Sequence, residues 1–197
     1  MKTGLVVLAV VALAVVVALG WFVSVGNDLV AREQAVREAW AQVQNVYQWR
    51  ADLIPNLVET VKGFAAQERT VLEDVTRARA SVAGLPITPE VLRDPEALKK
   101  FEEAQAQLGG ALGRLLAVVE RYPDLKSNQS FLALQSQLEG TENRIAVERR
   151  RYNEAVRAYN TAVRRFPGSL VASLRGFRER LYFEATPGSE APPAIKF

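Results

Sequence analysis

An uninterrupted apolar run near the N-terminus places the strongest constraint on what this chain can fold into. Residues 5–25 read LVVLAVVALAVVVALGWFVSV and contain no charged side chain. As an α-helix this run is about 31 Å long, which matches the hydrocarbon thickness of a lipid bilayer. The sequence therefore predicts a transmembrane helix over residues 5–25, preceded by a short flank of residues 1–4.

A cleavable signal peptide is the main alternative interpretation of this run. The apolar region of a signal peptide spans only about 7–15 residues, which is shorter than the run seen here. Ser24-Val25-Gly26 fits a small-x-small cleavage site, but Lys2 is the only charged side chain ahead of it. A core helix so uniformly apolar needs a large globule around it, which this chain does not offer. We interpret the run as a permanent membrane anchor.

Three residues mark the membrane interface expected at the end of this helix. Trp21 and Phe22 carry rings of the kind that are enriched at the boundary between lipid and water. Gly26 follows the span, and the adjacent Asn27 is a good helix cap, so the chain can end one helix here and start another. A hinge at Gly26 and one helix running straight through are both compatible with the sequence.

The residue types that are missing exclude several classes of function. The chain has no Cys and no His, so it lacks a thiol nucleophile, a disulfide, the commonest general base and the commonest transition-metal ligand. Its net charge is only +3, with acidic and basic residues interspersed, which argues against a nucleic acid partner. No nucleotide-binding glycine pattern or nucleophile elbow is present. We therefore expect no catalytic residue, cofactor or metal, and no enzymatic activity.

A helical spacing of apolar residues follows the anchor. Apolar side chains recur at intervals of three and four from Val36 to Val82, which predicts a helix over about residues 28–83 in a bundle or coiled coil. Pro55 lies inside this pattern and removes one backbone hydrogen bond, so we expect a structural kink near residues 51–55. The alternative is a break at this point, with Asp52 capping a new helix.

Proline and glycine residues divide the rest of the chain. Asp94 and Asn128 are well placed to cap the helices that follow these breaks. We predict helices over residues 95–122, 128–166 and 169–176. The Pro- and Gly-containing residues 184–197 are expected to form a disordered tail. The predicted fold is therefore all-α: a transmembrane helix followed by an antiparallel four-helix bundle of long helices within residues 26–183.

Two groups of polar residues on these helices are candidates for a specific role. Four glutamates could converge as an oxygen-only cation site, although we favour exposed or locally paired carboxylates: Glu59, Glu68, Glu142 and Glu148. Three asparagines on the helix over 128–166 could approach the interior and fix helix register through buried hydrogen bonds: Asn143, Asn153 and Asn160.

Three segments of this sequence resemble the LemA family. They are RADLIPNLVETVKGFAAQE (residues 50–68), LLAVVERYPDLKSNQSFLALQSQLEGTENRIAVERRRYNEAVRAYN (115–160) and FPGSLVA (166–172). The resemblance implies a single-pass bacterial membrane protein with a four-helix domain. It also implies a link with membrane organisation and, for some relatives, with building intracellular membrane organelles. The family offers no established catalytic residues to transfer. Trp49 and Gln67 stand where the family pattern has a basic residue and a His, so no catalytic or metal role is expected at residue 67.

Together these features favour a non-enzymatic, membrane-anchored helical scaffold. We expect it to contact the lipid bilayer, to self-associate as a homo-oligomer and to bind a protein partner that the sequence does not name, in membrane organisation or envelope-associated assembly. The alternative is a membrane-tethered signalling or sensor stalk acting through Gly26 or Pro55, and a carboxylate-only metal-binding protein is less favoured. Basic residues after the span favour a main domain in the cytoplasm. The resemblance implies the same orientation and a bacterial cell membrane.

Overall fold

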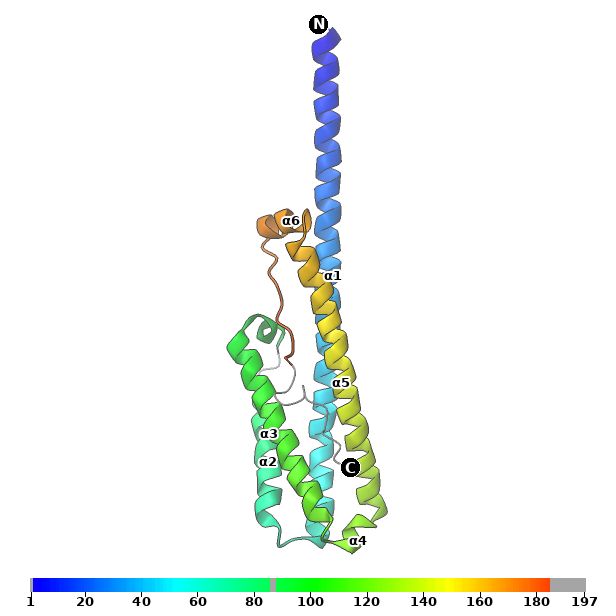
Figure 1. Ribbon diagram of the computed structural model, residues 1–197, viewed down its shortest axis with the longest axis vertical. Helices are drawn as coiled ribbons and strands as arrows, with labels where there is room; N and C mark the ends of the chain where they lie inside the picture. The colour runs from blue at the N-terminus through cyan, green and yellow to red at the C-terminus, as the bar shows by residue number, and fades with distance from the viewer. Residues whose placement is uncertain (1, 86–87, 185–197) are drawn as a thin grey trace, which may run out of the picture. The chain divides into compact units, whose positions relative to one another are not determined.

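The computed structural model describes residues 2–85 and 88–184, and all regular elements in these ranges are helical (Figure 1). The all-α prediction is therefore confirmed for this part of the chain. The chain divides into two compact units, Met1–Glu38 with Tyr152–Phe197, and Ala39–Arg151. Two long helices, α1 (Lys2–Phe64) and α5 (Gln129–Arg164), contribute residues to both units.

The first part of α1 carries the predicted membrane span. Among the described residues, α1 is the one helix that is long and apolar enough to cross a membrane. Its apolar side chains in this part are exposed, and Leu5, for example, is 71% exposed. Such a continuous exposed apolar surface is typical of a segment that contacts lipid. The helix continues through Gly26 and Asn27 without a break, which decides between the two alternatives at this junction.

The second part of α1 differs from the sequence prediction at its end. The helix passes through Pro55 but stops at Phe64, and α2 (Arg69–Ala83) begins after a short turn. The predicted helix over 28–83 is therefore two helices. The apolar spacing continues across the turn because α2 packs its own apolar stripe into the same core as α1. The spacing of apolar residues predicts which residues are buried, but it does not show where the helix ends.

The unit Ala39–Arg151 is a helical bundle with an apolar core. It also contains a 3-10 turn η1 (Pro89–Arg93), α3 (Pro95–Val119) and the short α4 (Pro123–Lys126). Helices α2 and α3 lie side by side. Both predicted caps are confirmed, because Asp94 accepts hydrogen bonds from the amides of Glu96 and Ala97, and Asn128 accepts one from the amide of Phe131. The core residues come from all five of these α-helices, including Leu57 of α1, Val75 of α2, Leu112 of α3, Leu125 of α4 and Phe131 of α5.

The unit Met1–Glu38 with Tyr152–Phe197 contains the span, the last part of α5, α6 (Gly168–Arg175) and an extended segment. A Cβ at Gly168 would lie 2.0 Å from the carbonyl oxygen of Ala162, so only glycine allows this tight approach between α5 and α6. Gly176 ends α6 in the left-handed conformation, with φ of 77°, as its position after the helix predicts. The predicted tail over 184–197 lies, except for Glu184, outside the described residues.

Candidate functional site: a tyrosine–asparagine clasp on α5

Residues 178–184 follow α6 as an extended segment, which we call the tail segment (orange to red after α6 in Figure 1). An extended chain leaves its backbone N–H and C=O groups without partners unless another element supplies them. Here the partners are side chains of α5 from the same unit. The tail segment is thus bound through its main chain, as a peptide ligand would be.

Two asparagines of α5 each bind one residue of the tail segment twice. Asn160 donates from Nδ2 to the carbonyl oxygen of Arg180 and accepts from the amide of Arg180 at Oδ1, both at 2.9 Å. Asn153 binds the carbonyl oxygen and amide of Phe183 in the same way, at 3.0 and 2.9 Å. A carboxamide can do this because it carries a donor and an acceptor side by side. Each asparagine therefore replaces the neighbouring strand that an extended residue would have in a sheet.

The tyrosine that precedes each asparagine extends the same pattern. The hydroxyl of Tyr159 donates to the carbonyl oxygen of Arg178 at 3.0 Å, and that of Tyr152 donates to the carbonyl oxygen of Leu181 at 2.8 Å. The two Tyr-Asn pairs are seven residues apart on α5, which is about 10.5 Å of helix. They bind positions three residues apart in the tail segment, which is about 10 Å of extended chain. The two repeats match in length, and we call the four side chains the Tyr-Asn clasp.

A buried arginine ties the tail segment to α1. Arg180 is only 5% exposed, and its guanidinium group pairs with the carboxylate of Glu33 on α1. It also donates to the carbonyl oxygen of Arg178 at 3.3 Å and lies 5.5 Å from the centre of the Tyr159 ring. A buried charge requires this degree of pairing, because its desolvation is costly. The clasp and this ion pair together join the tail segment to α5 and to α1.

Burial also favours the protonated form of one clasp residue, Tyr152. Desolvation raises the pKa of the Tyr152 hydroxyl far above its usual value, while the positive charge of Arg180 partly opposes this effect. The hydroxyl is therefore protonated at physiological pH and remains a donor. The ring of Tyr152 packs edge-on against Phe183, with the ring centres 5.2 Å apart.

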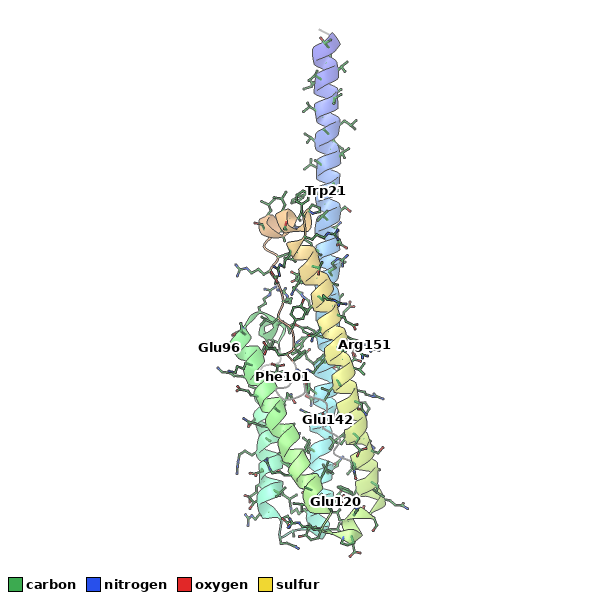
Figure 2. The ribbon with its side chains drawn as sticks, viewed as in Figure 1. Trp21, Glu96, Phe101, Glu120, Glu142 and Arg151 are labelled. Carbon is green, nitrogen blue, oxygen red and sulfur yellow. The ribbon has the colours of Figure 1, made fainter. Side chains whose placement is uncertain are left out.

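A second buried arginine lies inside the bundle of the unit Ala39–Arg151. Arg50 of α1 donates to the carboxylate of Glu142 at 2.9 Å and to the backbone carbonyl of Gln105 at 3.3 Å. Its guanidinium group lies 5.2 Å from the centre of the Tyr47 ring, and Tyr47 packs edge-on against Phe101 (Figure 2 labels Phe101 and Glu142). The Nε atom of Arg50 and the side-chain Nε2 atom of Gln105 are buried without a hydrogen-bond partner. We interpret this cluster as a link between helices.

The four glutamates considered as a cation site have separate partners. Glu59 lies 3.7 Å from Lys62, and Glu148 lies 2.7 Å from Arg151. Glu68 accepts from the hydroxyl of Tyr122, and Glu142 pairs with Arg50 as described. Within the described residues no three acidic side chains form a group suited to a metal ion. Glu59 and Glu148 are paired locally, each with a residue three positions away, whereas Glu68 and Glu142 bind residues that are far from them in sequence.

The asparagine prediction holds in part and needs one correction. Asn153 and Asn160 do use their amides in hydrogen bonds, whereas Asn143 is exposed. Their partner is the extended tail segment, so they do not fix the register of neighbouring helices. Arg180 and Glu33 were missed entirely. The Tyr-Asn dipeptide recurs after seven residues, which marks the four side chains in the sequence but does not identify the tail segment as their partner.

The remaining predicted residues lie on α1. Trp21 is partly exposed and is labelled in Figure 2, and Phe22 is half-buried. Gly26 is buried, and a Cβ at this position would lie 2.2 Å from a guanidinium nitrogen of Arg175. Pro55 is exposed within the helix. Their roles at the membrane interface and in a kink remain predictions.

These observations define a class: a helical-bundle protein with an N-terminal helix suited to span a membrane. Within this class, residues 39–197 match the LemA family, and the chain belongs to the LemA family. Relatives include magnetosome protein MamQ of Magnetospirillum gryphiswaldense and magnetosome protein MamQ 1 of Paramagnetospirillum magneticum. Each is 28% identical over 182 residues, which cover 84% of this chain and 67% of the relative. The family resemblance is confirmed, and the chain is a membrane-associated helical protein.

Proposed function

We propose that this protein is a non-enzymatic scaffold held at the bacterial cytoplasmic membrane by α1, with its main domain in the cytoplasm. In this role it acts in membrane organisation or envelope-associated assembly. The observation that carries the proposal is the continuity of α1, which runs from the predicted span past Gly26 into folded protein. Glu33, which binds the tail segment through Arg180, lies about 12 Å of helix beyond Val25.

A rigid connection of this kind suits a scaffold. A flexible tether would let the domain sample many heights and orientations above the bilayer. A continuous helix fixes the membrane-proximal residues relative to the span, and anchoring raises their effective concentration for weak partners at the same surface. The names of the relatives as magnetosome proteins support a role in membrane organisation. The buried polar groups of the clasp form hydrogen bonds with the tail segment of the same chain, which supports a non-enzymatic role.

Self-association is the finer part of the proposal. Large apolar side chains outside the span are exposed, including Trp49 and Phe64, and such residues are available for contacts between copies. Sedimentation equilibrium of the full chain in density-matched detergent should give a mass above that of one chain at micromolar concentration. A strictly monomeric mass across the micromolar range would contradict self-association, but it would not contradict the proposed membrane anchor.

Location and orientation are tested in the cell. The protein should stay with the membrane fraction after alkaline carbonate washing, because an integral span is not released by that treatment. Protease added to intact spheroplasts should leave the main domain uncut if it faces the cytoplasm. Cleavage within α2 or α3 in intact spheroplasts would overturn the proposed orientation.

The continuity of α1 also favours one second candidate, a signalling stalk. A helix shared between membrane and bundle can carry a rotation from one to the other. Insertion of one alanine after Leu19 would rotate the span by about 100° relative to the rest of α1. A signalling stalk predicts that this insertion changes hydrogen exchange in α2 and α3 in membranes. A scaffold predicts that exchange there stays the same.

A further inference from the structure

Helix α6 is apolar on two faces, one buried and one exposed. Val171 and Ala172 are buried against the rest of the unit. Leu170 and Leu174, one turn apart on the other face, are 51% and 68% exposed, and Phe166 just before the helix is 75% exposed. Large apolar side chains on one face of a surface helix ordinarily pack against a neighbouring element, and only the face that carries Val171 and Ala172 does so here. The exposed face of α6 therefore indicates a missing apolar neighbour.

The position of α6 on α1 identifies that neighbour. A guanidinium nitrogen of Arg175, the last residue of α6, lies 2.2 Å from the position that a Cβ on Gly26 would take. At the other end of α6, a Cβ on Gly168 would lie 4.0 Å from a methyl group of Leu29. Gly26 directly follows the predicted span, so α6 packs on the first turns of α1 outside it. Figure 2 shows Trp21 on α1 near the level of α6.

The charges around α6 are those expected at the surface of a bilayer. Arg165, three residues before α6, and Arg175, the last residue of α6, are both exposed and lie on either side of the apolar residues in sequence. Arginines flanking an apolar face are typical of helices that lie in the interface, because the guanidinium groups reach the phosphate headgroups while the apolar side chains enter the acyl region. An apolar protein groove would not require these flanking cations.

We propose that α6 lies in the interface of the bilayer that α1 crosses, with Phe166, Leu170 and Leu174 in contact with lipid. This inference rests on the proposed membrane anchoring and adds a second, lateral contact to it. A single helix crossing a bilayer is free to tilt and rotate, whereas a second contact beside it restricts both motions. The exposed face of α6 would thus set the orientation of the membrane-proximal unit on the lipid surface.

The absence of cysteine from the chain allows a direct test. A single cysteine carrying the environment-sensitive fluorophore NBD is placed at Leu174 (L174C) in the full chain. The chain is reconstituted into phosphatidylcholine vesicles with a minor fraction of phosphatidylglycerol. Two matched variants are V11C, in the middle of the span, and L132C, an exposed leucine of α5. All three positions are exposed, so the substitutions should not disturb folding.

The proposal expects NBD at L174C to emit at shorter wavelength than at L132C and to be quenched by a lipid nitroxide placed near the headgroups. NBD at V11C should be quenched most by a nitroxide deep in the acyl chains. An L174C signal like that of L132C, with V11C buried in lipid, would overturn the inference and leave the anchor intact. A blue shift at L174C that is lost on dilution of the protein in lipid would mean that a second copy covers α6, which also overturns it. A water-exposed V11C would overturn both proposals.

Discussion

Asparagine at 153 and 160 has a property that no other side chain of its size offers, a neutral donor and acceptor in one plane. Replacement of Asn160 by Asp keeps the shape and the oxygen that accepts from the Arg180 amide. The former Nδ2 donor becomes a carboxylate oxygen that faces the Arg180 carbonyl oxygen. The clasp therefore depends on the chemistry of the amide and not on its volume.

We predict that Asn160→Asp releases the tail segment. One buried hydrogen bond is lost and one carbonyl group is left facing a negative charge, at a cost of about 1–3 kcal/mol. The amides of residues 180–183 should exchange faster with deuterium, and trypsin should cut after Arg180 sooner. Asn143→Asp, at an exposed position of the same helix, is the control and should change neither readout. Equal protection in the two variants would contradict the role given to Asn160.

The tyrosines predict a dependence on alkaline pH. Burial raises the pKa of Tyr152, so above pH 10 the unfolded chain loses this proton before the folded chain does. The folded state binds more protons in that range, and its free energy of unfolding should fall as the pH rises above 10. Below pH 10 the hydroxyl is protonated in both states and makes no contribution to the slope.

The variant Tyr152→Phe should lose this part of the slope. The difference between wild type and variant should approach about 1.4 kcal/mol per pH unit above pH 10, measured by urea unfolding at a series of pH values. Tyr182→Phe, at an exposed tyrosine of the same unit, serves as the control. The same slope for wild type and Tyr152→Phe would show that the tyrosine is not buried as described.

At the level of elements, the starts of α3 and α5 and the end of α6 were predictable because local chemistry determines them. Asp94 and Asn128 cap the helices that they precede, and Gly176 ends α6, as their types and positions indicate. The turn between α1 and α2 was not predictable, because both sides of it feed one apolar core and keep one spacing. The tail segment was also beyond reach, since its partners lie about 20 to 30 residues away on α5.

Pro55 supplies a prediction at this scale. It lies in the interior of α1, where it cannot donate the backbone hydrogen bond of that turn. Pro55→Ala restores the donor at an exposed site and should raise the free energy of unfolding by about 1–3 kcal/mol. Urea unfolding of the detergent-solubilised chain measures the change, with Ala66→Ser in the turn after α1 as a neutral surface control. An unchanged or lower stability would mean that the proline fits α1 without cost.

At the level of the whole molecule, the family and the all-α fold could be predicted from the sequence. Long motifs and an uninterrupted apolar run can both be recognised without knowledge of the tertiary structure. The clasp required the structure. The clasp binds the last part of α5 to the tail segment, Arg180 of that segment pairs with Glu33 in the middle of α1, and no local pattern indicates that Arg180 meets Glu33. The proposed scaffold combines a membrane anchor, the continuous helix α1 and the unit that contains both the span and the clasp.

The measurement that tests this account most directly is hydrogen–deuterium exchange of the full chain in lipid nanodiscs. A rigid connection predicts slow exchange without interruption from residue 5 to residue 38, including Gly26, Asn27 and Asp28. Residues 5–25 should be protected by lipid, and residues 26–38 by helix α1 and its contact with the clasp. Fast exchange confined to residues 26–28 would reveal a hinge at the membrane surface and would contradict the central claim.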